Sequence, residues 1–100
     1  MLVAIACQKD MLTDYFGHSS HFSLYEMNQG KMIYIDDVVN SGHIPGTLPA
    51  FLHSLDVQVI ISGSMGDSAL RLLENYGIKI IISNQDKVKN IVQLYQDGKL

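Results

Sequence analysis

The feature that most constrains the fold of this chain is a junction between a strand and a helix near its middle. A β-branched apolar run at 57–61 stops at Ser62, glycines follow at Gly63 and Gly66, and a helical pattern begins at once. Such a junction is typical of a β-α-β unit, whose right-handed crossover makes the flanking strands parallel. Its backbone N–H groups lie beside the positive end of the helix dipole, which favours an anion or a compact polar ligand. The spacing matches neither the dinucleotide-binding fingerprint nor the phosphate loop, so it predicts a binding site without naming the ligand.

Length and charge narrow the class of protein. The chain has 100 residues, 47% of them apolar, which suits a single domain over residues 1–100 with one core. Its formal net charge is −3 and its lysines are scattered singly, which argues against nucleic-acid binding. The apolar start at 1–6 is too short for a signal or membrane segment and lacks a basic flank, so it is expected to be a strand and no membrane contact is expected.

The single cysteine, Cys7, limits the metal chemistry. One thiol cannot form an internal disulfide, which fits a reducing cytoplasm. It also cannot supply the full set of thiolates that an iron–sulfur cluster or a structural zinc needs. The chain can therefore cap a ready-made cluster but cannot build one.

Hydrophobic patterns predict five strands, at 2–7, 21–27, 31–39, 57–61 and 78–82. The first, fourth and fifth are mostly apolar, which predicts buried strands, and the β-branched run at 57–61 suits a central strand buried on both faces. The Asn28-Gln29-Gly30 sequence predicts a hairpin between the second and third strands. Segment 8–20 is expected to be a long loop with Tyr15 and Phe16 as its aromatic anchor, and loops of this length are often functional.

Three helices complete the pattern. The first is expected from Thr47, a capping residue, with Pro49 in its first turn. The other two are expected to begin at capping boxes and to end at glycines: Ser64 with Asp67 and Gly77, then Ser83 with Asp86 and Gly98. The order β-β-β-α-β-α-β-α therefore predicts an α/β fold with a five-stranded mixed sheet and three helices on its faces. Only the second strand runs antiparallel to the others.

This topology brings distant residues to one edge of the sheet. The carboxyl ends of the parallel strands and the start of the second strand share that edge, where ligands of open α/β sheets bind. Residues expected there are Cys7, His18, His21, the segment 40–46 with His43, the segment 62–66, Ser83 and Asn84. His53 falls in the first helix and is expected at the surface, away from this edge.

Several motifs in order along the chain resemble those of one protein family. They are Phe16-Gly17-His18-Ser19 with Phe22, the segments 46–52 and 62–69, Gly77-Ile78, and the ending with Tyr95, Gly98 and Leu100. Together they resemble the dinitrogenase iron–molybdenum cofactor biosynthesis family, which includes the NifX and NafY cofactor carriers and the C-terminal domain of many NifB proteins. The resemblance implies a ribonuclease-H-like three-layer fold. It also implies that the chain holds an iron–sulfur-based cofactor or its precursor, and that His43 stands where relatives often place a histidine.

The candidate site residues each have a structural alternative. Expected cofactor contacts are Phe16, Gly17, His18, His43, Gly63, Ser64, Met65 and Gly66, and expected metal ligands are His18, His43 and Cys7. The alternatives are a core role for Cys7 and Met65, a solvated imidazole for His18, and tight turns for the glycines. Carboxylates at Asp10, Asp14, Asp36 and Asp37 raise a two-metal nuclease as a further option. It is disfavoured because Asp10 and Asp14 fall in a loop instead of a central strand.

The leading functional hypothesis is a small cytoplasmic protein that carries the iron–molybdenum cofactor or an iron–sulfur precursor without catalytic turnover. Its partners would be the metallocluster and cofactor-assembly proteins. An alternative is a module that binds a small anionic metabolite or nucleotide at the 63–66 turn. A third is a protein-interaction domain that docks through a sheet edge or a helix face. An enzyme is disfavoured because no nucleophile–base spacing or acid–base pair stands out.

Overall fold

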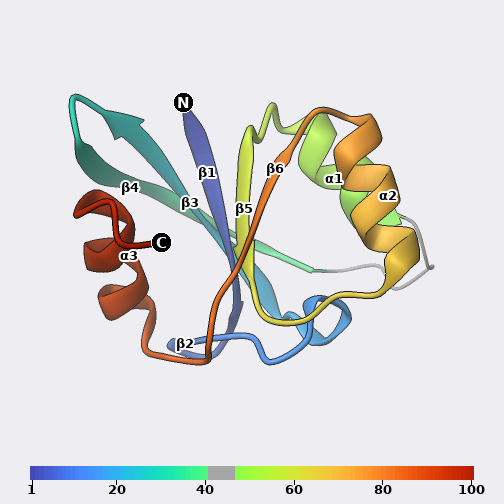
Figure 1. Ribbon diagram of the computed structural model, residues 1–100, viewed down its shortest axis with the longest axis horizontal. Helices are drawn as coiled ribbons and strands as arrows, with labels where there is room; N and C mark the ends of the chain where they lie inside the picture. The colour runs from blue at the N-terminus through green and yellow to red at the C-terminus, as the bar shows by residue number, and fades with distance from the viewer. Residues whose placement is uncertain (41–46) are drawn as a thin grey trace.

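Six strands and three α-helices make up the fold, which the computed structural model describes for residues 1–40 and 47–100 (Figure 1). The elements are β1 (Leu2–Gln8), β2 (Met11–Leu12), the 3-10 helix η1 (Phe16–His18), β3 (His21–Asn28), β4 (Lys31–Val39), α1 (Thr47–Ser54), β5 (Val59–Ser62), α2 (Asp67–Asn75), β6 (Lys79–Ile82) and α3 (Val88–Gln96). The predicted order of strands and helices is confirmed, with β2 and η1 added. His43 lies outside the described residues.

The strand directions are those that the sequence predicts. The sheet has the order β4-β3-β1-β5-β6, and β2 pairs with β1 off this path. The pairs β1·β5 and β5·β6 are parallel, whereas β3 is antiparallel to both β1 and β4. The carboxyl ends of β1, β4, β5 and β6 therefore lie at one edge of the sheet, together with the start of β3.

The predicted number of strands is wrong by one. Segment 8–20 is not wholly a loop, because Met11–Leu12 turns back along β1 in antiparallel register. Lys9 allows the tight turn by adopting a positive φ of 56°. The fully buried Leu12 supplies the hydrophobic reason for the extra strand, and its N–H donates to the Asp86 carbonyl at 2.8 Å. This bond ties the segment to the start of α3.

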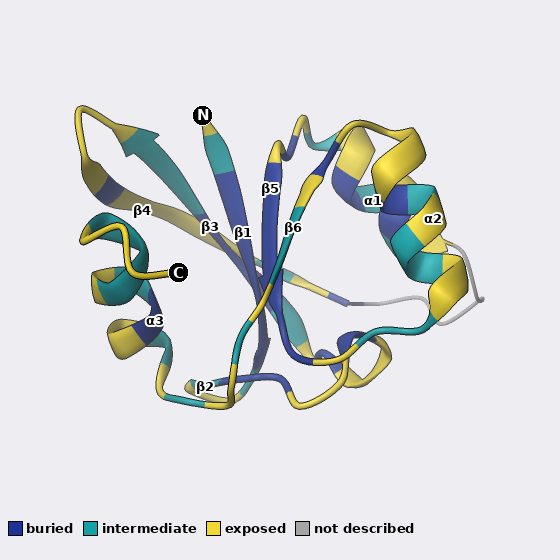
Figure 2. Cartoon of the chain, in the orientation of Figure 1, coloured by how far each residue is buried: buried dark blue, intermediate teal, exposed yellow. Residues whose placement is uncertain are grey.

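Helices cover both faces of the sheet, which gives three layers. Helices α1 and α2 pack Leu52 and Leu73 against one face, and α3 packs Ile91 against the other. Figure 2 shows β1 and β5 as the buried centre between these layers. Both strands are buried on two faces, as predicted for β5, and the predicted burial of β1 is confirmed. The prediction is wrong for β6, which forms an edge of the sheet and exposes Lys79 and Ile82.

The predicted helix ends are confirmed and two of the predicted starts are wrong. Gly77 and Gly98 follow α2 and α3 with φ of 75° and 71°, the left-handed conformation that terminates a helix. The N-cap residues, however, are Gly66 for α2 and Lys87 for α3, and neither makes a side-chain capping bond. The two proposed capping boxes do not form, because α2 begins at Asp67 and α3 at Val88, too far along the chain for Ser64 and Ser83 to be the N-cap residues. Among the helices of the described segments, none is long and apolar enough to cross a membrane.

Candidate functional site

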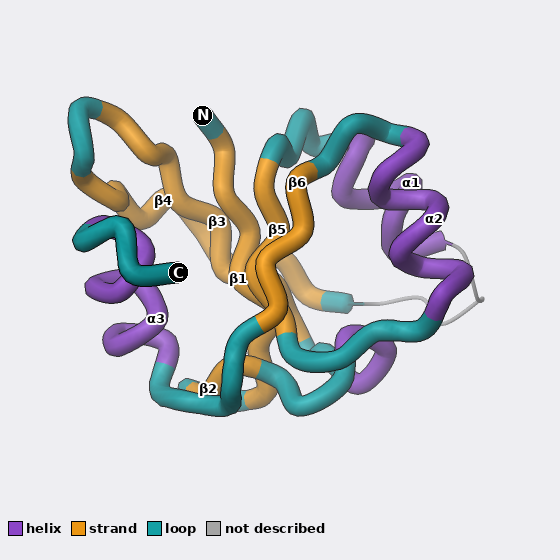
Figure 3. The backbone as a smooth tube through the Cα atoms, viewed as in Figure 1, coloured by secondary structure: helices purple, strands orange, loops and turns teal. Residues whose placement is uncertain are grey.

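Three connections meet at the carboxyl edge of the sheet, which we call the rim. Figure 3 shows the segments that follow β2, β5 and β6 running together at this end of the molecule. The strands place them there because β1, β5 and β6 are parallel neighbours. The chain leaves β1 toward β3 on one side and leaves β5 toward β6 on the other. A reversal of this kind is where open α/β sheets form ligand crevices.

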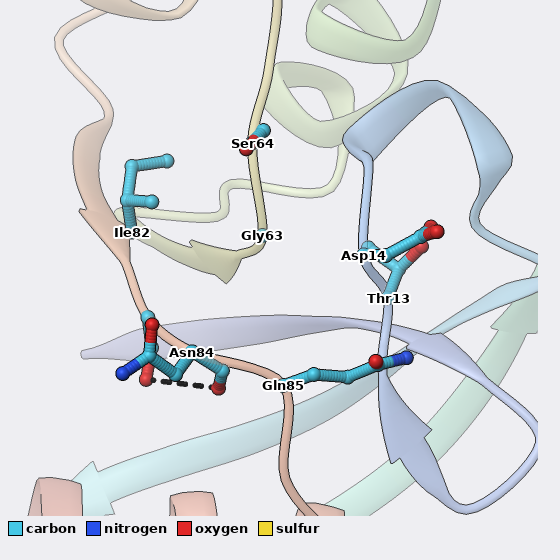
Figure 4. Close-up of a pocket in the computed structure, with 8 residues that line it drawn as sticks. Thr13, Asp14, Gly63, Ser64, Ile82, Asn84 and Gln85 are labelled. Atoms are coloured by element: carbon cyan, nitrogen blue, oxygen red, sulfur yellow. Dashed lines mark hydrogen bonds between the residues drawn. The ribbon is translucent and has the colours of Figure 1, made fainter.

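A cleft of about 460 Å³ opens at the rim. Its lining residues come from all three connections: Thr13, Asp14, Gly63, Ser64, Ile82, Ser83, Asn84 and Gln85. Figure 4 shows the Gly63–Ser64 backbone between the Thr13–Asp14 segment and the end of β6, with Gln85 extending toward Thr13. The lining is rich in hydroxyl and amide groups and includes one carboxylate but no lysine or arginine.

Gly63 fixes the geometry of this cleft. A Cβ atom at this position would overlap the backbone carbonyl oxygens of Thr13 and Asp14 and would lie 2.7 Å from the Asp14 carbonyl carbon. Two backbones therefore touch where only glycine fits, although its φ is not in the left-handed region. The contact holds the segment after β2 against the segment after β5.

The two predicted turns, 16–18 and 63–66, come together at the rim. The Phe16 N–H donates to the Ser64 carbonyl at 2.8 Å, and the Ser64 N–H donates to the Asp14 carbonyl at 3.0 Å. Phe16 itself is 3% exposed and its ring packs against Phe22 with centroids 5.9 Å apart. Phe16 is thus confirmed as an aromatic anchor, and it holds the following turn beside the start of α2.

His18 presents its imidazole to solvent at this turn. Its side chain is 65% exposed, and Nδ1 lies 3.6 Å from Asp14 Oδ1. The Tyr15 ring is the other neighbour, with centroids 5.2 Å apart. Because Nδ1 faces the carboxylate, Nε2 is the ring nitrogen left for a ligand, an arrangement that is common for metal-binding histidines.

Cys7 lies apart from these residues. Its side chain is fully buried in the apolar layer under α3, whereas Phe16 belongs to the layer under α1 and α2. The thiol donates to the Ile5 carbonyl at 3.2 Å and contacts Ser23 Oγ at 3.7 Å. Burial raises the pKa of the Cys7 thiol from its ordinary 9.0, and the hydrogen bond with Ser23 offsets this only in part. The structure does not bring Cys7 and His18 into one site.

We expect Cys7 to be unreactive in the folded protein. A buried, protonated thiol reacts through opening of the structure, so Ellman's reagent should modify it on the order of 100-fold more slowly than in denaturant. Because the pKa is higher in the folded state, the contribution of this group to stability is complete below pH 9.0 and falls as pH rises further. Rapid, stoichiometric modification of the native protein, with the Cys7→Ala variant as blank, would show instead an accessible thiol.

The remaining candidates lie apart from the cleft lining. The Nδ1 atom of His21 is hydrogen-bonded to Ser20 Oγ at 3.0 Å. His53 is exposed at the opposite end of the sheet, where its ring stacks on Tyr76. Asp36 and Asp37 are on β4. Within residues 1–40 and 47–100, no three His, Cys, Asp or Glu side chains are grouped as a metal site would need. The described part of the chain therefore offers no ready mononuclear or two-metal centre.

Two buried side-chain atoms near the rim lack a hydrogen-bond partner among the described residues. They are Ser62 Oγ, at the end of β5, and Asn40 Oδ1, directly after β4. A buried polar atom without a partner is costly, and such atoms are normally satisfied by water, a ligand or another part of the chain. Both therefore mark the rim as a place where polar groups remain to be satisfied.

Sequence reasoning missed part of the site. Thr13, Ile82 and Gln85 line the cleft, and Tyr15 lies over the rim instead of anchoring the core. The polar residues after β6 are a sequence signal for this part of the cleft, and the predicted place of Ser83 and Asn84 at this edge is confirmed. No sequence pattern shows which of two adjacent aromatic residues is buried.

A comparison with protein-family profiles decides the family. The profile described as "Dinitrogenase iron-molybdenum cofactor" matches residues 1–98. The chain belongs to this family. The resemblance of the motifs is thereby confirmed, and membership associates the chain with the iron-molybdenum cofactor of dinitrogenase. A comparison with curated proteins gives no significant match.

Solved structures show the same fold. The crystal structure of PH0822 superposes with a TM-score of 0.91 at 21% identity, over 100% of this chain and 94% of that one. A Thermotoga protein described as NifB-like gives 0.73 at 23% identity, over 98% and 89%. The apo form of the orange protein from Desulfovibrio gigas gives 0.78 at 21% identity, over 98% and 88%. At these identities the likeness concerns the fold alone.

Proposed function

We propose that this protein binds and carries an iron–sulfur-based metallocluster, the iron-molybdenum cofactor or a precursor, at the rim, without catalytic turnover. The observation that carries the proposal is the meeting of the 16–18 turn and the 63–66 turn in a member of this family. We place the activity in the cytoplasm. We also assign the three layers to the ribonuclease-H-like fold that the resemblance implies, with β2 as an addition.

The donor set suits a preassembled cluster better than a single metal ion. A cluster brings its own bridging sulfides, so it needs only one or two protein ligands at open metal positions. His18 offers an exposed imidazole, and α2 offers first-turn N–H groups that its N-cap residue, Gly66, does not cap with a side chain. Backbone N–H groups and hydroxyls can donate to sulfide or oxygen atoms of the bound cargo. The Ser62 hydroxyl, buried at the end of β5 and without a hydrogen-bond partner among the described residues, adds a polar group at the same edge.

The placement of Cys7 narrows the ligand set. A thiolate is the soft ligand that iron prefers, but Cys7 is fully buried and its pKa is raised. We therefore propose His18, together with His43, as the protein's metal contacts, and we leave Cys7 out of the site. Gly17, Gly63, Ser64, Met65 and Gly66 remain proposed contacts of the cargo, mainly through the backbone.

The second candidate function is binding of a small anionic metabolite or nucleotide. The uncapped start of α2 favours it, since helix N-termini bind anions. The charges around that start oppose it, because Asp14 and Asp67 are nearby and no lysine or arginine lines the cleft. A polyphosphate would meet two carboxylates without a cation to neutralise it. We rank this function below the metallocluster carrier.

The third candidate function is that of a protein-interaction domain. The surface that best suits it is the edge strand β4. Ile33, Tyr34 and Ile35 are exposed there. A β-bulge interrupts this strand, and Gln96 Oε1 accepts the Met32 N–H at 2.7 Å. Both features hinder pairing with another strand. We therefore propose that cofactor-assembly proteins, as partners, meet the protein at the rim to deliver or remove the cluster.

Anaerobic titration with isolated iron-molybdenum cofactor tests the proposal. The wild-type protein should retain a brown species through gel filtration. Loss of a metal ligand in His18→Ala should weaken binding at least as much as the roughly 10- to 100-fold that loss of a ligand's outer-shell partner costs, and further when His43 is replaced as well. His53→Ala is the matched control, because that imidazole is exposed at the opposite end of the sheet.

Three results would count against the carrier. Equal binding by His18→Ala and the wild type would remove this imidazole from the site. Failure of the wild type to bind the cofactor would overturn the function itself. A rise in melting temperature with inorganic phosphate or ATP in the absence of metal, lost in Gly66→Val, would favour the anion-binding module instead.

A further inference from the structure

Tyr15 occupies a position at the rim that packing alone does not explain. Its side chain is 40% exposed, whereas the adjacent Phe16 is 3% exposed and fills the core. Exposure alone is ordinary for a tyrosine, but this ring lies beside the exposed imidazole of His18, and its hydroxyl lies beside Gly66. The Tyr15 ring extends over the start of α2, where the two turns of the site meet.

Two glycines make room for this ring. A Cβ atom at Gly17 would lie 3.3 Å from Tyr15 Cε2, and one at Gly66 would lie 3.1 Å from the Tyr15 hydroxyl oxygen. Both positions have negative φ, so neither needs glycine for its backbone conformation. Their smallness therefore serves the placement of the phenol. The hydroxyl lies beside Gly66, the N-cap residue of α2.

The backbone of Tyr15 is fixed while its hydroxyl is unpartnered. The Tyr15 carbonyl accepts hydrogen bonds from Thr13 Oγ1 at 2.8 Å and from the His18 N–H at 2.9 Å. Tyr15 also pairs with Ser64 as a parallel bridge. Within the described residues the phenol hydroxyl makes no hydrogen bond, and the only ring beside it is His18, at a centroid distance of 5.2 Å.

We propose that Tyr15 contacts the bound cargo directly and is a specificity-determining residue of the rim. This inference rests on the proposed function. The hydroxyl donates a hydrogen bond to a sulfur or oxygen atom of the cargo at the start of α2, while the adjacent His18 ligates the metal. The ring, carried on a rigid backbone, forms an apolar wall on the His18 side of the site and limits the access of water.

Substitution of Tyr15 tests the inference with isolated iron-molybdenum cofactor as the probe. Tyr15→Phe keeps the ring and removes the donor, so the dissociation constant should rise about tenfold, as for loss of a hydrogen bond to a charged group. Tyr15→Ala also removes the wall and should weaken binding further. Tyr76→Phe is the matched control, because Tyr76 is 38% exposed and lies at the opposite end, stacked on His53.

A spectroscopic readout separates contact from a structural role. The chain has five tyrosines, so tyrosine labelled at its ring ε positions gives one signal from each of five rings to follow. The Tyr15 signal should be the first to shift or broaden as cofactor is added. If Tyr15→Phe and Tyr15→Ala bind as the wild type does while His18→Ala is weakened, the inference is overturned and the proposed function stands. If the wild type binds no cofactor, both fall.

Discussion

Replacement of Gly63 by alanine is expected to lower the free energy of unfolding by about 3 kcal/mol, a large share of the stability of a domain of this size. The added methyl group would overlap the backbone carbonyls of Thr13 and Asp14. Backbone atoms cannot move aside as a flexible side chain can, so either the segment after β2 detaches or β5 shifts in the sheet. Urea denaturation followed by circular dichroism measures the change.

Gly66→Ala is the matched control for this prediction. It adds the same methyl group three residues later, but the atom nearest to the added Cβ is the Tyr15 hydroxyl oxygen, at 3.1 Å. That oxygen is the far end of a side chain, which can rotate away. We expect less than about 1 kcal/mol of destabilisation there. Equal and small effects at both positions would show that the segment after β2 does not rest on Gly63, and that the cleft is not built as described.

Replacement of Phe16 by alanine is expected to cost about 3–5 kcal/mol of unfolding free energy. The ring is 3% exposed and packs on Phe22 in the apolar layer beneath α1 and α2. Its loss would leave a cavity under the turn that carries His18, so binding at the rim should weaken along with stability. The melting temperature and the affinity for isolated iron-molybdenum cofactor should therefore fall together.

Phe16→Leu distinguishes a core residue from a ligand contact. Leucine keeps most of the buried volume, so the loss of stability should be about 1 kcal/mol and the affinity should change little. A stable Phe16→Leu variant that no longer binds the cofactor would contradict the core assignment. It would make the phenyl ring itself part of the recognition surface.

The fold was largely predictable because its strands carry period-two or continuous apolar patterns. The directions of β1, β3, β4, β5 and β6, and the hairpin at Gln29 and Gly30, follow from such patterns and from turn chemistry. What escaped prediction depends on contacts between distant segments. The strand β2 forms because Leu12 finds a buried place under α3, and β6 is exposed because no strand follows it across the sheet.

The candidate site was predictable in its location but not in its composition. Strand directions alone place the segment after β5 at the same edge of the sheet as the segment that follows β1. Sequence could not show that the Cys7 side chain points to the α3 face, because strand alternation fixes a face only once the neighbouring layers are known. Nor could it show that Gly17 and Gly66 accommodate Tyr15, since that requires the path of the 13–18 segment.

Mapping the bound cluster on the wild-type protein tests the central claim most directly. In 15N-edited NMR spectra, the paramagnetic iron-molybdenum cofactor should broaden amide signals near it. The account predicts loss of signals from Asp14, His18, Ser64 and Gly66, with those of Gln58 and Gly77 at the opposite end of the sheet preserved. Broadening centred on Gln58 and Gly77, or uniform loss without a centre at the rim, would contradict it.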